Sequence, residues 1–198
     1  MAIDSMELVR VVNGRLVPAP GIWEFDQGHT EVAFEGRHLM VTKIRGRFTR
    51  FDGRLLMADI PEESVAEIKI DSTSVDSGFK DRDDHLKSPD WFDVERHPTI
   101  TFRSGELSHV SGNHWKAKGQ LTIKAMTRPI DLDVEFTGAV TDPWGNSKIG
   151  AVVTATVDRE TWDLRWNMPL DAGAVVVGTQ IQLTVNVEAV FRGALRPD

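Results

Sequence analysis

The chain contains no cysteine and no tyrosine, and it has no long run of apolar residues. The missing cysteines exclude disulfides and thiolate metal sites. No stretch approaches the unbroken apolar length of a transmembrane helix, so we expect no transmembrane segment. The first ten residues are acidic where a secretory leader would be basic. We therefore expect no signal peptide and a cytoplasmic location.

Positive charge is in deficit, with 23 Lys and Arg against 30 Asp and Glu and a net charge of -7. Such a balance opposes binding to nucleic acid or to an anionic membrane overall, although a local basic patch can survive. Arg45, Arg47 and Arg50 are interleaved with Phe48 and Phe51, a pattern seen on β surfaces that bind single strands. The outward face of a barrel strand explains the same residues, and we expect no nucleic-acid partner.

Helical periodicity is scarce, and the dominant hydrophobic pattern has a period of two. A length of 198 residues fits one large β domain better than two small domains. One apolar and one polar face per strand indicate antiparallel sheet, and closure would remove the edges that long strands leave exposed. We therefore predict an all-β sandwich or barrel. The clearest alternating runs are Ser64–Asp71, Thr99–Arg103, Trp115–Ile123, Ile130–Thr137 and Ile181–Glu188.

Four segments interrupt or precede this pattern. Ser88–Phe92 predicts a short helical turn with Ser88 as its N-cap, and Lys80–Lys87 predicts another turn. His38–Lys43 is interpreted as a short lid between strands. Residues 1–20 are predicted to form an extension that adds an edge strand or stays mobile.

The most crowded segment, Arg82–Phe92, combines charge, histidine and aromatic residues. Asp81 and His85 have the i, i+4 spacing of two helical metal ligands, but a solvated charged turn explains them equally. The sequence has no HExxH, no G-x-S-x-G and no glycine-rich phosphate loop. We therefore predict no metal, no cofactor and no catalytic residue. An enzyme that uses Asp83 and His85 at a cavity mouth remains a rival hypothesis.

Six tryptophans and nine phenylalanines supply large apolar side chains, and several fall on the apolar strand faces. A small barrel can fill its interior with such side chains or leave room for one apolar ligand. Alternation does not distinguish a packed core from a lined cavity. A filled barrel acting as an interaction module is therefore the second rival.

The order of motifs resembles the YceI-like family of polyisoprenoid-binding or lipid-binding proteins. The resemblance spans about Gly21 to Ala189, and its most specific part lies between Arg82 and Phe102. The motifs are Gly28-His29-Thr30-Glu31-Val32-Ala33-Phe34 with Arg37-His38-Leu39, Ile44–Phe48 with Phe51-Asp52-Gly53, Arg82-Asp83-Asp84-His85-Leu86 with Phe92-Asp93-Val94 and His97–Phe102, Gly119–Ile123 with Thr127–Ile130, Asp142-Pro143-Trp144-Gly145, Trp162–Trp166, and Val177–Ile181.

The resemblance implies an extended, lipocalin-like antiparallel β-barrel of about eight strands. It further implies a long amphiphilic ligand, an isoprenoid or acyl lipid held in an apolar tunnel, and a homodimer. We expect a barrel domain at residues 21–191, between an N-terminal extension at 1–20 and a C-terminal tail at 192–198. Where the family usually has Asp-Phe-Gly-Leu, this chain has Thr161-Trp162-Asp163-Leu164, which adds bulk and charge near the tunnel end.

The alternation and the resemblance together predict the ligand-binding residues. Polar groups at the mouth, which would select the head group, are Arg82, Asp83 and His85, followed by His38 and Asn167. The predicted apolar lining is Phe34, Phe48, Ile68, Phe92, Ile100, Phe102, Trp115, Leu121, Val134, Trp166 and Leu183.

Overall fold

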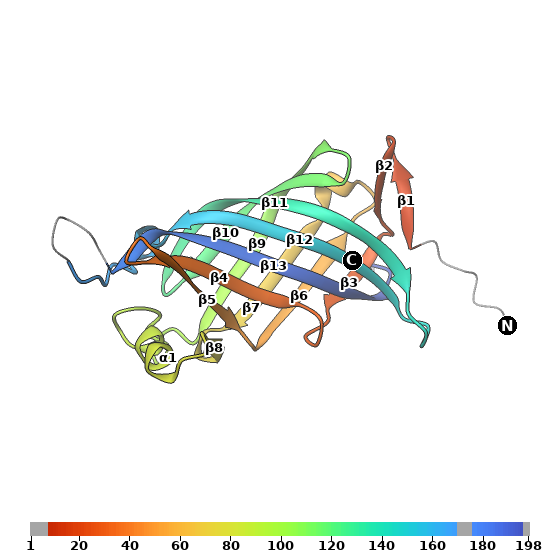
Figure 1. The fold of residues 1–198 in the computed structure, drawn as a ribbon. Helices are drawn as coiled ribbons and strands as arrows, with labels where there is room; N and C mark the ends of the chain where they lie inside the picture. Colours follow the sequence, from red (N-terminus) through yellow and green to blue (C-terminus); the bar gives the residue numbers. More distant parts are fainter. Residues whose placement is uncertain (1–7, 170–175, 196–198) are drawn as a thin grey trace.

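The computed structural model describes residues 8–169 and 176–195, and its main feature is a closed antiparallel β-barrel (Figure 1). The predicted all-β barrel of about eight strands is confirmed. The eight strands of the ring, in their order around it, are β3 (Gly21–Phe25), β6 (Phe51–Met57), β7 (Val65–Asp71), β9 (Thr99–Ser111), β10 (His114–Ile123), β11 (Met126–Thr141), β12 (Ser147–Asp158) and β13 (Val177–Gly193).

The barrel branches along one strand. The C-terminal half of β13 pairs with β3, whereas its N-terminal half pairs with β4 (Glu31–His38). Strand β4 continues through β5 (Thr42–Phe48) to the two-residue β8 (Val75–Asp76). This side sheet widens the barrel at the end where the helix α1 (Lys80–Lys87) lies (Figure 1).

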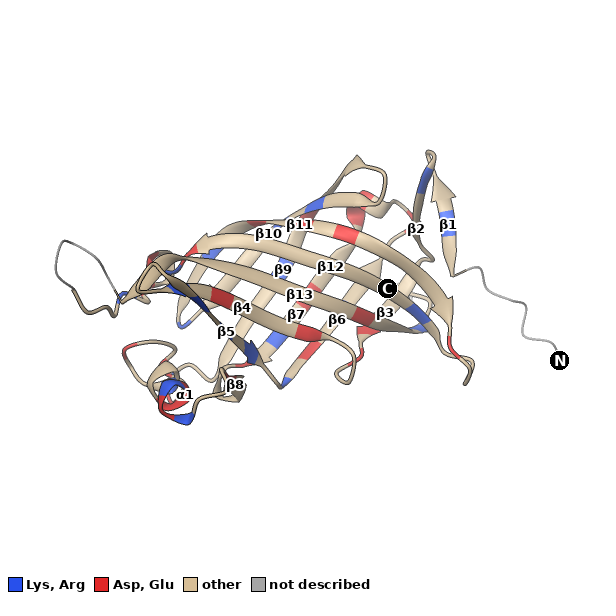
Figure 2. Cartoon of the chain, viewed as in Figure 1, with Lys and Arg blue, Asp and Glu red and all other residues tan. Residues whose placement is uncertain are grey.

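The alternation of the sequence separates the two faces of the barrel wall. Lys, Arg, Asp and Glu positions are spread along the barrel strands (Figure 2), where exposed residues alternate with buried ones. There, Glu67 of β7 pairs with Arg54 of β6 at 2.8 Å and with Arg103 of β9. Lys116 of β10 pairs with Asp133 of β11 at 3.1 Å. These cross-strand pairs join neighbouring strands while the apolar residues between them point inward.

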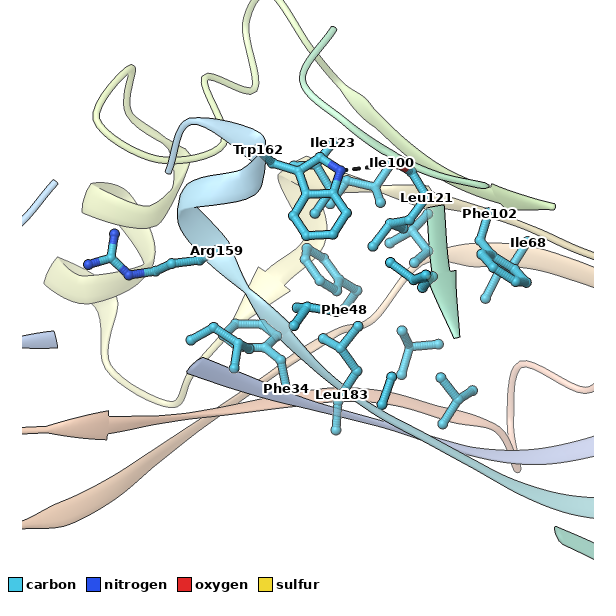
Figure 3. A pocket seen from close by; sticks show the side chains of 18 of the residues that line it. Phe34, Phe48, Ile68, Ile100, Phe102, Leu121, Ile123, Arg159, Trp162 and Leu183 are labelled. Atoms are coloured by element: carbon cyan, nitrogen blue, oxygen red, sulfur yellow. Dashed lines mark hydrogen bonds between the residues drawn. The ribbon is translucent and has the colours of Figure 1, made fainter. Parts of the chain in front are cut away.

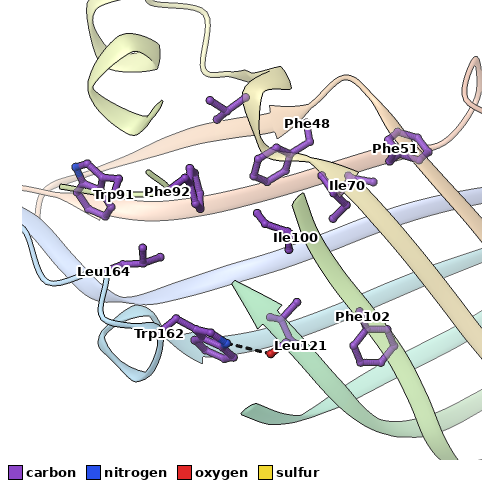
Figure 4. Packing of buried hydrophobic residues seen from close by; sticks show 12 residues of the cluster. Phe48, Phe51, Ile70, Trp91, Phe92, Ile100, Phe102, Leu121, Trp162 and Leu164 are labelled. Carbon is purple, nitrogen blue, oxygen red and sulfur yellow. Dashed lines mark hydrogen bonds between the residues drawn. The ribbon is translucent and has the colours of Figure 1, made fainter. Parts of the chain in front are cut away.

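The inward residues form two hydrophobic clusters, one toward each end of the barrel. The cluster near α1 includes Phe48, Ile100 and Phe102 (Figure 4). The other is built around Trp23, Trp115 and Phe136. The interior is therefore organised in two halves along the barrel.

The N-terminal extension forms a separate hairpin of β1 (Val9–Val12) and β2 (Arg15–Pro18), so it is neither an edge strand of the barrel nor unstructured over these residues. Asn13 (φ 51°) and Gly14 (φ 76°) form its two-residue loop. This Asn-Gly pair is the usual sequence of a type I′ turn, and it is the signal that could have predicted the hairpin. The hairpin packs at the end opposite α1, where Val17 is buried in the second cluster (Figure 1).

Residues His38–Lys43 form a tight hairpin turn, which corrects the predicted lid. The carbonyl of His38 accepts a hydrogen bond from the Val41 amide at 3.0 Å. The two central residues, Leu39 (φ 52°) and Met40 (φ 59°), have the left-handed backbone of a type I′ turn. For a residue with a Cβ atom, this left-handed conformation is unfavourable by roughly 1–2 kcal/mol.

The helical elements differ in position from the prediction. Lys80–Lys87 forms the complete helix α1, and Ser88 is its C-cap, so Ser88 is not an N-cap. Residues after Ser88 make hydrogen-bonded turns, with the Trp91 amide donating to the Ser88 carbonyl at 3.1 Å. Three short 3-10 turns, η1 (Pro61–Glu63), η2 (Ser72–Ser74) and η3 (Arg159–Trp162), complete the set of described helical elements. Within the described ranges, no helix has the length and apolarity needed to cross a bilayer.

Candidate ligand cavity

The barrel half nearer α1 encloses an apolar cavity of ≈ 160 Å³, called here the inner cavity. Every lining residue is aliphatic or aromatic except Thr154 and Arg159. Figure 3 shows Phe34, Phe48, Ile100, Leu121 and Leu183 around this space. An apolar cavity of about 150 Å³ stays dry and takes up a molecule such as benzene. The inner cavity therefore has the size and lining for an apolar group.

A second cavity of ≈ 140 Å³, the far cavity, occupies the half nearer the β1–β2 hairpin. Its two polar lining residues, Ser64 and Ser104, use their hydroxyl oxygens to accept hydrogen bonds from backbone amides, at 3.0 Å and 2.8 Å. The inner and far cavities share three lining residues, Phe102, Leu132 and Val153. The two spaces therefore meet at these side chains.

A third hollow of ≈ 400 Å³, the vestibule, opens at the α1 end. It shares Phe34, Leu86, Trp91 and Ile181 with the inner cavity. Its remaining lining includes polar side chains from β4 and α1. The vestibule therefore joins an amphiphilic surface to an apolar interior.

The predicted residues divide between these three spaces. Phe34, Phe48, Ile68, Phe92, Ile100, Phe102, Leu121 and Leu183 line the inner cavity. Trp115 and Val134 line the far cavity, and His38, Arg82, His85 and Trp166 line the vestibule. Their contact with a ligand stays a prediction.

Two of the polar residues predicted at the mouth make hydrogen bonds within the protein instead of lining a cavity. Asp83 accepts hydrogen bonds from the amide and the hydroxyl of Ser77, the former at 2.8 Å. Asn167 donates to the Val177 carbonyl at 2.7 Å and accepts from the Val177 amide at 3.1 Å. Neither residue lines one of the three spaces.

Asp83 does not contact His85 in the way a catalytic pair would. His85 Nε2 lies 3.2 Å from Asp90 Oδ2, and its ring packs edge-on against Trp166 with centroids 4.4 Å apart. Residues two apart on a helix point in different directions, which accounts for the separate partners. His85, Trp91 and Trp166 instead form an aromatic cluster beside the vestibule.

Trp162 and Asp163, the residues that depart from the resembled motif, have different environments. Trp162 is buried against the inner cavity, and its Nε1 donates to the Leu121 carbonyl at 3.1 Å (Figure 3). Asp163 has φ 59°, the left-handed conformation for which glycine is favoured. Its exposed side chain pairs with Arg165, so the added charge stays outside the cavity.

Arg159 lines the inner cavity and is only 2% exposed, and pattern reasoning missed it. Its guanidinium donates to the carbonyls of Gly178 at 3.1 Å, Val177 at 3.4 Å and Leu164. Its Cζ lies 5.0 Å from the Trp91 ring centroid. Burial lowers the pKa of Arg159, because removal from water disfavours the charged form. Arg159 thereby joins η3, β13 and the loop after α1 at the inner end of the vestibule.

A separate polar cluster lies on the outside of the barrel. Asp26, His29 and Glu188 have potential metal-ligand atoms within 4.8 Å of one another. Lys148 already donates to Glu188 at 2.6 Å and lies 3.5 Å from Asp26. A hydrogen bond from His29 is the main cause of the lowered pKa of Asp26. The lysine neutralises part of the acidic charge, so we interpret the cluster as a cross-strand ion-pair network.

A family model for the YceI-like domain matches residues 23–189, which is most of the chain. The chain belongs to the YceI-like family. A UPF0312 protein of Staphylococcus aureus (strain N315) is 35% identical over 167 residues, covering 83% of this chain and 94% of that protein. A UPF0312 protein of Staphylococcus epidermidis (strain ATCC 35984) is 32% identical over 171 residues, covering 84% and 95%.

Solved structures show the same fold for this YceI-like protein at low sequence identity. The crystal structure of Burkholderia cenocepacia BcnA superposes with a TM-score of 0.71 at 21% identity, covering 83% of this chain and 98% of that one. A polyisoprenoid binding domain from Saccharophagus degradans gives a TM-score of 0.64 at 13% identity, covering 86% and 98%. At these identities the likeness concerns the barrel alone.

Proposed function

We propose that this YceI-like protein binds one long-chain amphiphilic lipid, a polyisoprenoid or fatty-acid derivative, and sequesters or carries it. The observation that carries the proposal is the pair of apolar cavities, which meet at Phe102 inside the barrel. The S. degradans neighbour, named as a polyisoprenoid binding domain, supports the same ligand class. Membership of the YceI-like family likewise favours binding over catalysis. A homodimer and a cytoplasmic location stay predictions.

The energetics of an apolar chain agree with this proposal. Burying one methylene contributes roughly 0.8 kcal/mol, so twelve buried carbons contribute roughly 10 kcal/mol before losses. Ordering the chain and losing its translational freedom offset a large part of that gain. The remainder still supports micromolar or tighter binding without a specific polar contact. The polar lining of the vestibule would then meet the head group.

Native mass spectrometry of gently purified protein tests the proposal. We expect an added mass that disappears after extraction with organic solvent and reappears when a prenyl or acyl chain is supplied. The interior-filled variant Ala155→Phe, purified in parallel, is expected to carry less of that mass because Ala155 lines the inner cavity. If the wild type never carries or takes up such a chain, the barrel is a packed interaction module and the proposal fails.

A further prediction concerns the aromatic cluster between the vestibule and the inner cavity. Trp166 contacts His85 and lies with its ring centroid 6.0 Å from that of Trp91. Trp166→Ala removes a large side chain from the ligand's route, so we expect release of a bound fluorescent acyl chain to accelerate roughly tenfold, equivalent to about 1.4 kcal/mol of barrier. Stopped-flow displacement measures this rate.

The matched control for that prediction is Trp144→Ala, which removes the same side chain from an exposed turn at the other end of the barrel. Its release rate should equal that of the wild type. Equal rates for Trp166→Ala and the wild type would show that the chain does not pass Trp166.

A further inference from the structure

Five exposed apolar side chains lie in segments next to the vestibule, and one of them, Phe79, is part of its lining. Val41 is 80% exposed in the β4–β5 turn, Phe79 is 59% exposed just before α1, and Met168 is 54% exposed after η3. Leu39 and Met40 of the same β4–β5 turn are also exposed. We call these five residues the apolar rim.

Backbone contacts hold the parts of the rim together. The Val176 amide donates to the Met168 carbonyl at 3.3 Å, and the Val176 carbonyl accepts from the Leu39 amide at 2.9 Å. Phe79 lines the vestibule together with Val176. Figure 1 places the β4–β5 turn and α1 at the same end of the barrel. The rim is therefore one surface around one opening.

The apolar residues of the β4–β5 turn are not the residue types that its backbone conformation favours. Leu39 and Met40 occupy the left-handed positions of a type I′ turn, where asparagine and glycine are favoured. The β1–β2 hairpin of the same chain does use Asn13 and Gly14 in these positions. Strained residues of this kind concentrate where a binding surface requires them.

The segments that carry the rim lack the acidic excess of the whole chain, although carboxylates lie beside them. Segments 37–43, 78–80 and 165–168 contain four basic residues and no acidic one, although the whole chain has a net charge of -7. Three of the four pair with carboxylates next to the rim; two of these pairs are exposed on both sides, and exposed pairs contribute little to stability. The three pairs are Lys43–Glu35, Lys80–Asp84 and Arg165–Asp163.

We propose that the apolar rim docks this protein onto an anionic lipid bilayer, with the vestibule facing the lipid. Apolar side chains enter the boundary between head groups and acyl chains, while the neighbouring basic side chains meet the phosphates. The inference builds on the proposed lipid binding, because a barrel that opens at the bilayer surface can take up a chain without exposing it to water. Docking itself is a separate property and is measured separately.

Vesicle flotation of the full-length protein tests the docking. We expect the wild type to float with phosphatidylcholine vesicles that contain a minority of phosphatidylglycerol, and more weakly with phosphatidylcholine alone. The double variant Val41→Asp/Met168→Asp should lose roughly tenfold or more in partitioning, because two apolar contacts become charged. Trp144→Asp, which places the same charge on an 84% exposed residue at the opposite end, should partition like the wild type.

A second variant separates docking from folding. Leu39→Asn/Met40→Gly relieves the turn, so we expect a melting temperature that rises by about 2–6 °C. The same variant should bind vesicles less tightly. If Leu39 and Met40 had a purely structural role, a variant with a higher melting temperature would not bind vesicles less tightly.

Three outcomes would overturn the docking proposal. The first is equal vesicle binding by the wild type and both rim variants, and the second is loss of binding in Trp144→Asp only. The third is absence of vesicle binding together with a dimer that the rim variants convert to monomer in sedimentation, since a second copy then covers the rim. Uptake of an acyl chain from detergent-free solution is measured in parallel, so a failure of lipid binding is distinguished from a failure of docking.

Discussion

Ala155→Phe is expected to weaken binding of chains of every length, whereas Ala151→Phe is expected to weaken only the binding of long ones. Both alanines lie on β12 four residues apart, Ala155 at the inner cavity and Ala151 at the far cavity. A chain that enters from the vestibule reaches the inner cavity first. A phenylalanine at 155 therefore blocks the route, and one at 151 closes only its end.

The size of the effect depends on how many methylenes of the bound chain the new side chain excludes from the cavity. Excluding about four methylenes removes roughly 3 kcal/mol, which is roughly a hundredfold in Kd. Titration with a series of saturated acyl chains of increasing length measures the effect. We expect a uniform loss for Ala155→Phe, and for Ala151→Phe a loss that begins only beyond a threshold length.

Thr156→Phe is the control on the same strand. Thr156 is exposed and bonds Gln182 on the outer face, so the added ring should leave every affinity unchanged. Wild-type affinity for long chains in both folded alanine variants would place the ligand outside the barrel. The reverse pattern, with Ala151→Phe affecting all lengths and Ala155→Phe only the long ones, would show entry from the hairpin end.

Arg159→Met is expected to lower the free energy of unfolding by about 3 kcal/mol or more. The substitution removes the donors of three hydrogen bonds, two of which are the buried bonds to the carbonyls of Gly178 and Leu164, while the Val177 carbonyl keeps its bond from Asn167. It also removes the cation over the Trp91 ring. For a domain of this size the melting temperature should fall by about 6–12 °C. Urea denaturation followed by tryptophan fluorescence measures the change.

Arg159→Lys distinguishes the shape of the group from its charge. Lysine keeps the positive charge but not the planar fork that reaches separate carbonyls, so we expect this variant to be destabilised as well. Arg165→Met is the exposed control, because Arg165 pairs with an exposed Asp163, and it should stay within about 0.5 kcal/mol of the wild type. If the free energy of unfolding of Arg159→Met lies within about 1 kcal/mol of the wild type, the hydrogen bonds of Arg159 do not stabilise the fold as we expect.

Much of the fold could be predicted because strand alternation is a local property. In β10, Trp115, Ala117 and Leu121 point inward, while Lys116 and Lys118 point outward, as the period of two requires. Together with the family resemblance, the same rule predicted strand residues such as Phe34 and Leu183, which line the inner cavity, and their contact with a ligand stays a prediction. The rule failed at His38–Lys43, because Leu39 and Met40 are unusual residues for the turn that they form.

The polar part of the candidate site was harder to predict because it depends on contacts between distant segments. Asp83 is two residues from His85, yet α1 directs it to Ser77, and Asn167 is used by the Val177 backbone. Arg159 looked like an ordinary polar residue after a strand. Its burial depends on carbonyls that β13 and Leu164 supply.

The sequence by itself determined the antiparallel strands, their inward faces and the membership of the YceI-like family, because these depend on residue order and side-chain type. Only the tertiary structure decided that the interior is hollow in two places and that Phe102 stands between them. The same inward alternation fits a packed core and a lined cavity. Which one forms depends on the barrel's diameter and on how side chains from opposite walls meet, and neither is a property of a single strand.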